Sequence, residues 1–566
     1  MSATASESLP PVLRGAVADI PWDDTTEVIV VGSGAAGWSA AIAAQVSGAQ
    51  ALVVEKAGHV GGTTAQAGGA WAGSRASTWL WICNNHLMQA QGIDDSRERA
   101  LRYMARLAEP LSYRPEAENL GLRMHQFETL EAFYDHGSRV VRTLHELGVL
   151  DFLIVPEVLD YYSDLPENTA PHGRTLGFRV GSDHEGIGAE LIDALQHAAD
   201  AHGVRLRLQS PVRAVVVDPD SGRVNGVVSG NRAGDMQFIR ALRGVVFATG
   251  GFASSSKRRR TFLRGPILAG LSARGNTGDF LDIASELGAV IDNMNEAWLT
   301  PIVLDHVPDP PSGAFRLPGD SMLVVNTAGQ RVVNEKATYN EFTRAFFHWD
   351  PSTASYPNLP LIMIYDQWVA EHCRQLPGDA PVTDGGGNPI PVQGRNDTHE
   401  LCAETLAELS HLIGRHLEKY RHLMPTATLA PGFAASLRSS IERFNRQATT
   451  GHDPDFARGA TSVQRIRSGP CHDPASPNPT MYPLSDRGPY YAVLLGPGAL
   501  DTKGGPAIDA DGRIRARRGG VIPGLYGAGN CVASPAGQGY WGGGATLGLA
   551  VTFGYLAGEH AAREQR

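Results

Sequence analysis

The feature that most constrains this chain is a glycine pattern directly after a short apolar run. Residues 28–31 read Val-Ile-Val-Val, and Gly32, Gly34 and Gly37 follow with the spacing G-x-G-x-x-G. A stretch of small residues comes next, and a second apolar run, ALVV, leads to Glu55. A strand, a glycine turn, a helix, a second strand and then an acid form the pattern of a dinucleotide-binding unit. The sequence therefore predicts an α/β fold that begins with such a unit.

Each part of this unit has a physical task. The first glycine permits the tight turn, the second lets backbone N–H groups approach a pyrophosphate, and the third lets helix and strand pack closely. Ala35 and Ala36 begin the helix, whose positive N-terminus favours the charge of the phosphates. We expect Glu55 to accept hydrogen bonds from the ribose hydroxyls and to disfavour a 2′-phosphate.

A second glycine-rich loop, KAGHVGGTTAQAGG, follows the acid and favours FAD over NAD. A domain for NAD would ordinarily continue with another helix and strand, whereas a second Gly/Thr loop suits the longer FAD molecule. Later strand-and-turn segments, SPVRAVVV and VVFATGG, would bring more backbone to the same cofactor. The cofactor contacts that we expect from these parts are Lys56, Gly61, Gly62, Thr63, Thr64, Gly68, Gly69, Val212, Ala248, Thr249, Gly250 and, more loosely, Asp279.

Composition limits the class of protein. With 566 residues the chain exceeds one ordinary core, so we expect two or more domains. Its net charge of −10 argues against nucleic acid as a partner. No apolar window is long enough for a transmembrane segment, and the first twenty residues lack the form of a signal peptide. The five cysteines have no metal-ligand spacing, so we expect no metal site and a cytoplasmic location.

Five segments occur in one order along the chain: VIVVGSGAAG, VEKAGHVGGTTAQAGG, VVFATGG, GQRVVNEKATY and GLYGAGN. Together they resemble the flavoprotein family of fumarate reductases and 3-ketosteroid dehydrogenases, over nearly the whole chain. The resemblance implies non-covalent FAD and a Rossmann-like FAD-binding domain, discontinuous in sequence, with an inserted α+β catalytic domain. We place the FAD-binding domain at residues 22–297 and 475–566, and the catalytic domain at residues 298–474.

A last glycine cluster, GQGYWGGGATLGLAVTFGYLAG, lies near the C-terminus. Runs of glycine mark places where backbone approaches something closely, and the resemblance implies that this cluster lies against the flavin ring. The helix that follows would direct its N–H groups at the ring and stabilise negative charge on its reduced form. The contacts expected from this part are Gly529, Asn530, Ala545, Leu547 and Gly548.

The resemblance also indicates the chemistry. Fumarate reductases are expected to carry an arginine shortly after an RFVNE-type motif, but RVVNEKATYNEF offers Tyr339, which removes the cation that a dicarboxylate needs. In the 3-ketosteroid Δ1-dehydrogenases a tyrosine at this place acts as the base. Their terminal Tyr-x-Gly-x-Gly-Ala-Thr motif binds the ketone oxygen, which gives Tyr540 and the amide of Gly544 that role. Relatives of the Δ4 type carry serine where Gly542 stands.

One residue of the family pattern is missing. A further tyrosine, which relays the proton, is expected in the segment LEAFYDHGSRVVRTLHELG. The aligned position holds Phe133, with Tyr134 beside it. Either Tyr134 serves as the relay through a shifted register, or the relay differs and the substrate is not an ordinary steroid.

Two further predictions concern single residues. Lys503 is expected to be solvated or in a turn, and Trp81 is expected to add aromatic surface.

We therefore expect an FAD-dependent dehydrogenase that forms a double bond α,β to a ring ketone, by Δ1-dehydrogenation of a 3-ketosteroid. The alternatives are a desaturase of a smaller cyclic ketone of the cyclohexanone type and an enone reductase in the manner of fumarate reductase. A non-enzymatic FAD-binding scaffold would not need tyrosines at the ketone-binding positions. The partners are then a small cyclic ketone and an electron acceptor that the sequence does not identify.

Overall fold

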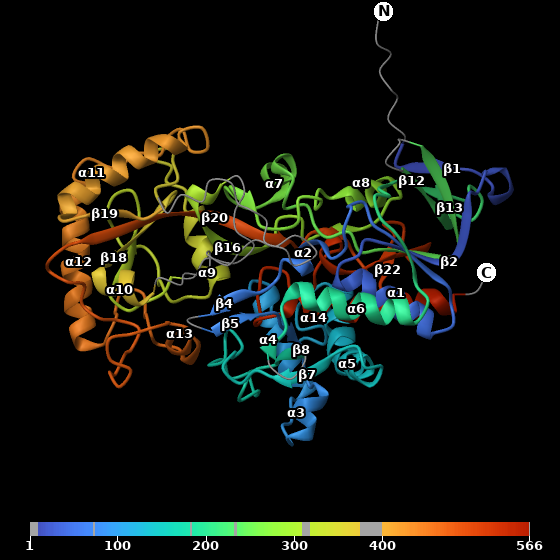
Figure 1. Cartoon of the computed structure of the whole chain (residues 1–566), viewed down its shortest axis with the longest axis horizontal. Helices are drawn as coiled ribbons and strands as arrows, with labels where there is room; N and C mark the ends of the chain where they lie inside the picture. Colours follow the sequence, from blue (N-terminus) through green and yellow to red (C-terminus); the bar gives the residue numbers. More distant parts are fainter. Residues whose placement is uncertain are drawn as a thin grey trace, which may run out of the picture.

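The computed structural model describes residues 10–71, 74–180, 184–230, 235–307, 317–373 and 399–564. The chain forms two lobes, one built around a nine-stranded sheet and the other around a six-stranded sheet. Figure 1 shows the long strand β20 (Tyr490–Thr502) running from the smaller lobe into the middle of the molecule. Strands and helices alternate in the larger lobe, so the predicted α/β class is confirmed.

The nine-stranded sheet has a parallel centre in the order β10-β3-β2-β13, and β23 continues it beyond β13. Residues 28–31 and 51–54 are buried, as expected for strands that are covered on both faces. The strands of this sheet are β1 (Val12–Arg14), β2 (Asp24–Val31), β3 (Ala51–Val54), β10 (Arg205–Arg207), β11 (Val212–Val217), β12 (Val224–Gly230), β13 (Met236–Phe247), β22 (Arg513–Arg515) and β23 (Val521–Gly527).

Helices α1 (Ala35–Val46) and α14 (Ala545–Arg563) pack backbone to backbone against each other in the larger lobe. A Cβ on Gly554 would lie 2.3 Å from the carbonyl oxygen of Ala36, and one on Gly558 would lie 2.0 Å from that of Ala40. The glycines late in the last cluster therefore serve helix packing. The other helices of this lobe are α2 (Gly62–Ala65), α3 (His86–Ala90), α4 (Arg97–Ala108), α5 (Met124–Glu146), α6 (Gly188–Ala201), α7 (Ser256–Phe262) and α8 (Asp279–Glu286).

The six-stranded sheet forms the core of the smaller lobe, and β20 pairs with four of its strands. Its other strands are β14 (Ala269–Gly270), β16 (Ala297–Val303), β17 (Met322–Val325), β18 (Leu361–Asp366) and β19 (Leu401–Ala403). The helices here are α9 (Tyr339–Arg344), α10 (Gln367–His372), α11 (Leu406–Leu417), α12 (Phe433–Thr450) and α13 (Ser462–Ile466). Strand β20 follows residue 474 in sequence yet belongs to this sheet, and the predicted domain limits stay predictions.

Three small sheets complete the described structure. They contain β6 (Leu80–Trp81), β7 (Asp151–Ile154), β8 (Thr175–Val180) and β9 (His184–Glu185); β4 (Gly69–Trp71) and β5 (Ser74–Ser77); and β15 (Ile291–Asp292) and β21 (Gly505–Pro506). Within the described ranges, none of the helices combines the length and the hydropathy that a membrane span requires.

Candidate active site

The glycine turn between β2 and α1 has the geometry that the sequence predicts. Gly32 has a φ of +105°, a conformation that strains residues other than glycine. A Cβ there would lie 2.4 Å from the carbonyl oxygen of Ala248, and a Cβ on Gly37 would lie 2.0 Å from that of Gly32. A Cβ on Gly34 would meet no atom closer than 3.6 Å, so the other parts of the chain do not crowd this position as they crowd Gly32 and Gly37.

The carboxylate of Glu55 lies at the same turn, directly after β3. Its Oε2 atom accepts hydrogen bonds from the backbone N–H of Ser33 at 3.0 Å and from the hydroxyl of Ser33 at 2.7 Å. The N–H of Ala57 donates to Oε1 at 2.8 Å. The N–H of Ser210 donates to the carbonyl oxygen of Glu55 at 2.9 Å, which brings the chain just before Val212 alongside. The acid is held beside the first turn of α1, where a ribose contact is expected.

The second glycine-rich loop lies against the first. Gly61 and Gly62 have φ angles of +104° and +50°, and Gly68, before β4, has +115°. The N–H of Gly61 donates to the carbonyl oxygen of Ser33 at 3.1 Å. The hydroxyl of Thr64 accepts from the N–H of Ala35, the first residue of α1, at 3.2 Å. The two predicted phosphate-side loops therefore form one surface.

Thr63 connects this surface to the turn that follows β13. Its hydroxyl accepts a 3.0 Å hydrogen bond from the side-chain amide of Asn276. The same amide donates to Asp501 at 2.7 Å, and a Cβ on Gly250 would lie 2.3 Å from its nitrogen. The predicted turn at residues 248–250 thus meets the second loop through this asparagine.

Lys56 and Asp279 form an ion pair between the second loop and the start of α8. The distance from Nζ to Oδ2 is 2.6 Å. Although burial opposes the shift, the pKa of Asp279 is lowered by the ammonium of Lys56 and by the hydroxyl of Thr277. The structure therefore brings these two predicted cofactor contacts together, with the carboxylate engaged by the lysine.

Two helix N-termini supply the donors that FAD requires. The N-cap residues of α1 and α14 are Gly34 and Gly544, and neither helix has a side-chain cap. The N–H of Ala35 donates to Thr64 and that of Ala545 to the carbonyl oxygen of Gly542. The positive N-terminal ends of the two helices favour a phosphate at α1 and negative charge on a flavin ring at α14, whose first turn contains Ala545 and Leu547. The residues present therefore fit FAD. A Cβ on Gly548 would lie 2.2 Å from the carbonyl oxygen of Trp81, so this glycine also permits close packing.

The turn after β23 contains the predicted contacts Gly529 and Asn530. Gly529 has a φ of +72°. The side-chain amide of Asn530 donates to Asp501 at 3.3 Å, and its oxygen accepts from the indole N–H of Trp298 at 3.1 Å. The ring of Trp298 in turn lies 4.7 Å from that of Tyr540. This turn therefore connects the cofactor surface with the predicted ketone site.

Three tyrosines from distant parts of the chain meet beside α14, and we call Tyr161, Tyr339 and Tyr540 the tyrosine group. The hydroxyl of Tyr161 donates to that of Tyr339 at 2.8 Å. The centroid of the Tyr540 ring lies 5.4 Å from that of Tyr339 and 5.2 Å from that of Tyr161. Tyr339 is the first residue of α9, and Tyr540 lies in the loop before α14.

Gly544 presents a main-chain donor next to this group. Its φ is +90°, and a Cβ there would lie 2.5 Å from the backbone of Trp79, so the position requires glycine. Its carbonyl oxygen accepts from the N–H of Trp81 at 3.1 Å. In the part of the chain that the structure describes, the N–H of Gly544 makes no hydrogen bond and is available to a ligand.

Burial controls the acidity of these phenols. It raises the pKa of Tyr339 well above the ordinary value, as do the neighbouring Tyr161 and Tyr540, while the guanidinium of Arg467 lowers it. Burial also raises the pKa of Tyr540 to about 12. Tyr540 is therefore a neutral donor at physiological pH, and ionisation of Tyr339 depends on help from its surroundings.

A buried network fixes the loop at residues 540–544. The indole N–H of Trp81 donates to Asp160 at 2.7 Å, and the rings of Trp81 and Trp541 lie 5.3 Å apart. The N–H of Tyr161 donates to the carbonyl oxygen of Trp541 at 2.9 Å. The segment that carries Tyr161 is therefore fastened directly to the loop that carries Tyr540.

Lys503 is completely buried in the connection between β20 and β21, so the prediction that it is solvated is wrong. Its Nζ atom donates to the carbonyl oxygens of Gly537 at 3.0 Å and Gly539 at 2.6 Å, and lies 4.0 Å from the ring centroid of Trp298. Burial lowers its pKa to about 7. Lys503 anchors the chain that leads into Tyr540.

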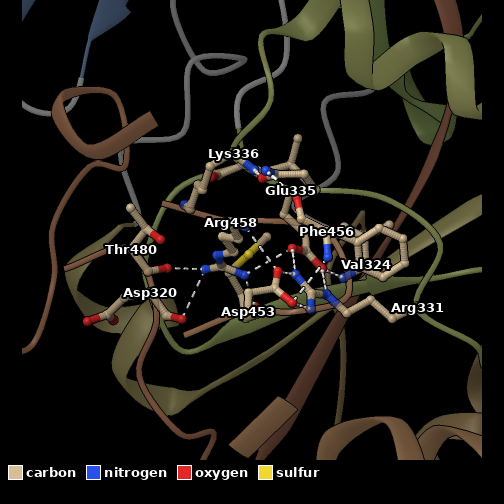
Figure 2. Close-up of polar contacts among 12 residues, drawn as sticks. Asp320, Val324, Arg331, Glu335, Lys336, Asp453, Phe456, Arg458 and Thr480 are labelled. Atoms are coloured by element: carbon tan, nitrogen blue, oxygen red, sulfur yellow. Dashed lines mark hydrogen bonds and ion pairs between the residues drawn. The ribbon is translucent and has the colours of Figure 1, made fainter. Parts of the chain in front are cut away.

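A buried ion network holds the segment that ends in Tyr339 (Figure 2). Arg331 makes paired hydrogen bonds to Glu335, at 2.7 and 2.8 Å, and to Asp453, at 3.0 and 2.7 Å. Arg458 lies 3.3 Å from Glu335 and also donates to main-chain carbonyl oxygens. Although burial opposes the shift, both arginines lower the pKa of Glu335. The network makes the start of α9 a rigid support.

The residues of α5 that were candidates for the proton relay pack elsewhere. Phe133 stacks on Trp81 at 6.1 Å and on Trp541 at 5.9 Å. The hydroxyl of Tyr134 donates to the main-chain carbonyl of Asp95, and the structure does not bring it to the tyrosine group. Trp81 is itself completely buried, so the prediction that it adds aromatic surface is wrong.

Sequence reasoning missed Tyr161, which lies in LDYYSDLPE between β7 and β8. No motif marks this loop, and the tyrosine pair within a polar stretch is its only local signal. Arg467, directly after α13, was missed as well, although its guanidinium carbon lies 4.6 Å from the ring centroid of Tyr161.

Comparison with known proteins adds to this geometry. A family model described as "FAD binding domain" matches residues 27–547. A 3-oxosteroid 1-dehydrogenase of Mycobacterium tuberculosis is 29% identical, over 95% of this chain and 98% of that protein. A 4-oxocyclohexanecarboxylate 2-dehydrogenase of Sinomonas cyclohexanicum is 32% identical, over 94% and 92%. The crystal structure of 3-ketosteroid Δ1-dehydrogenase from Sterolibacterium denitrificans with 1,4-androstadiene-3,17-dione superposes with a TM-score of 0.77 and 27% identity, over 95% and 99%.

Proposed function

We propose, from the premise that this chain belongs to the FAD-binding domain family, that it introduces a carbon–carbon double bond next to a ring ketone. It is an FAD-dependent oxidoreductase, and both the family resemblance of its motifs and the prediction of FAD are confirmed. The observation that carries the proposal is the 2.8 Å hydrogen bond between the hydroxyls of Tyr161 and Tyr339, beside Tyr540 and Gly544.

The ketone oxygen is the first group that such a site must bind. A C–H bond α to a carbonyl becomes acidic only when the developing enolate is stabilised. The hydroxyl of Tyr540 and the N–H of Gly544 are two donors without charge, each of a kind worth roughly 3–4 kcal/mol in a transition state. Since burial raises the pKa of Tyr540 to about 12, this phenol keeps its proton and can donate it in a hydrogen bond.

Removal of the proton on the α carbon is the second task of the site. The C–H bond breaks as an O–H bond forms at the phenolate oxygen of Tyr339, and we assign the later transfer of that proton towards solvent to Tyr161 in place of Tyr134. FAD, when bound, supplies the acceptor for the hydride that leaves the β carbon. The chain's own residues thus bind the oxygen, orient the ring and take the proton, while the two electrons leave with the hydride.

Two classes of ketone are candidates. We favour a 3-ketosteroid, dehydrogenated at the Δ1 position, and the 3-oxosteroid 1-dehydrogenase relative and the Sterolibacterium structure support this. A smaller ketone of the cyclohexanone type is the second candidate, because the Sinomonas relative is named for 4-oxocyclohexanecarboxylate. The electron acceptor, non-covalent attachment of FAD, the domain limits and the cytoplasmic location stay predictions.

Anaerobic mixing of the holoenzyme with each ketone tests the proposal. We expect flavin absorbance to bleach with a 3-ketosteroid, and the ratio of its rate to that with 4-oxocyclohexanecarboxylate decides between the two classes. Bleaching with the cyclohexane compound alone would remove steroids. If neither ketone bleaches the flavin while an enone reoxidises the reduced protein, the chain is a reductase and the proposal is wrong.

A further inference from the structure

Arg467 lies over both members of the hydrogen-bonded tyrosine pair. Its guanidinium carbon is 4.6 Å from the ring centroid of Tyr161 and 6.0 Å from that of Tyr339. Both distances are within the range in which a cation is attracted to an aromatic face. One positive charge therefore faces the two phenols whose hydroxyls are joined at 2.8 Å.

The short helix α13 holds this arginine against both tyrosine-bearing segments. At its start, the N–H and hydroxyl of Ser462 donate to Asp164, at 3.1 and 2.9 Å, in the loop just after Tyr161. At its end, the carbonyl oxygen of Ser468 accepts from the Nζ of Lys336 at 3.1 Å, shortly before Tyr339 in sequence. The ammonium of Lys336 also donates to two further main-chain carbonyls, at 2.7 and 2.6 Å. Helix α13 is thus a bridge whose last turn places the guanidinium.

Two other charged groups near the site have partners that the structure shows. From α9, Glu341 lies 3.3 Å from Arg344 and, together with burial, raises the pKa of the neighbouring Tyr162. From the end of β20, Lys503 faces the ring of Trp298. Arg467 lowers the pKa of Tyr339 against the effect of burial, and it adds to the hydrogen bonds of Tyr339 and Thr546 in lowering that of Tyr540.

Proton removal needs an ionised phenol, and burial raises the pKa of Tyr339. A guanidinium over the ring faces favours the phenolate form, because its attraction to a negative ring exceeds its attraction to a neutral one. The cation lowers the basicity of the Tyr339 phenolate, but it raises the ionised fraction of Tyr339, and the rate depends on the product of the two.

We propose that Arg467 is a positioning residue whose guanidinium, over the rings of Tyr161 and Tyr339, favours the ionised form of Tyr339 that takes the substrate's α proton. The C–H bond of the substrate breaks, the O–H bond forms at Tyr339, and the charge of this phenol changes from −1 to zero. This inference rests on the proposed function, and it adds to that function a residue from a third segment of the chain.

The pH profile of anaerobic flavin reduction tests it. Arg467→Met should lower the rate constant at neutral pH about 10-fold and shift the rise of the profile upward by about one pH unit. The two profiles should converge at high pH, and Arg467→Lys should recover most of the rate constant that Arg467→Met loses. Arg465→Met is the matched control, because Arg465 anchors the same helix through a 2.7 Å hydrogen bond to Gly459.

A wild-type profile in Arg467→Met overturns the inference. An equal loss of the rate constant at every pH in Arg467→Met and Arg465→Met also overturns it, because such a loss would indicate only that α13 is less firmly held. If wild-type flavin is not reduced by any ketone, the proposed function fails, and ionisation is then measured without turnover. The tyrosinate absorbance lost in Tyr339→Phe is titrated with and without Arg467→Met: an upward shift without the arginine supports the inference, and no shift refutes it.

Discussion

Lys503→Met tests whether the lysine buried behind the loop that carries Tyr540 titrates near neutral pH in the folded protein. The ammonium is completely buried, donates to the carbonyl oxygens of Gly537 and Gly539, and has a pKa of about 7 in the folded protein. The ordinary value for lysine is 10.5. Burial therefore disfavours the charged form, and the contribution of Lys503 to the free energy of unfolding depends on pH.

The direction in which the free energy of unfolding changes with pH follows from the numbers of protons that the folded and unfolded chains bind. Below about pH 7 both the folded and the unfolded chain carry the proton, and the full cost of burying the charge is present, about 5 kcal/mol for a shift of about 3.5 units. Between about pH 7 and pH 10.5 the unfolded chain binds more protons than the folded one, so stability rises with pH. From about pH 7 to pH 9 this single group should add about 2 kcal/mol to the free energy of unfolding of the wild type.

Urea unfolding of wild-type and Lys503→Met holoenzymes measures the difference. The free energy of unfolding of the wild type should rise relative to that of the variant by about 2 kcal/mol over this interval, because methionine does not titrate. Lys257→Met, on the exposed surface of α7, is the control and should run parallel to the wild type. A constant difference between the wild type and Lys503→Met from about pH 7 to pH 9 would refute the reasoning, because the lysine would then keep an ordinary pKa.

Two further changes test the site. Tyr339→Phe should slow flavin reduction by ketone about 10²–10⁴-fold, the contribution typical of a general base, and Tyr161→Phe should slow it less, with flavin absorbance retained in both; equal activity of Tyr339→Phe and wild type in rapid mixing would exclude this base. Gly542→Ala places a Cβ 2.6 Å from the ring of Trp81 and should lower the free energy of unfolding by about 1–3 kcal/mol. Its control is Gly414→Ala, where the nearest atom to the new Cβ is 3.6 Å away; equal urea midpoints for the two variants would contradict the close packing.

The cofactor surface was predictable because its signals are local. The turn at Gly32, the acid at Glu55 and the loop at Gly61 lie within one short stretch, and each is required by backbone geometry or by charge that a sequence pattern records. The resemblance to a family extended the prediction to Tyr339 and Tyr540, because motifs surround both.

The errors concern properties that arise only in the tertiary structure. Lys503 stands beside two glycines in sequence, so a turn was a reasonable interpretation, but the chain folds its ammonium onto two carbonyl oxygens and an indole ring. Trp81 lies in what looks like a surface loop, yet it packs against the rings of Phe133 and Trp541. Burial of this kind depends on segments far away in sequence, which no local pattern reports.

Tyr161 shows why sequence reasoning looked for the relay in the neighbourhood of α5. It stands 178 residues before Tyr339, in a loop without a motif, and only folding brings the two hydroxyls together. The structure packs the ring of Phe133 against those of Trp81 and Trp541. The lack of a hydroxyl at Phe133 had favoured a substrate other than an ordinary steroid, but with Tyr161 as the relay that we propose it does not count against a steroid. The relative rates of flavin reduction by the two ketones must therefore decide the substrate.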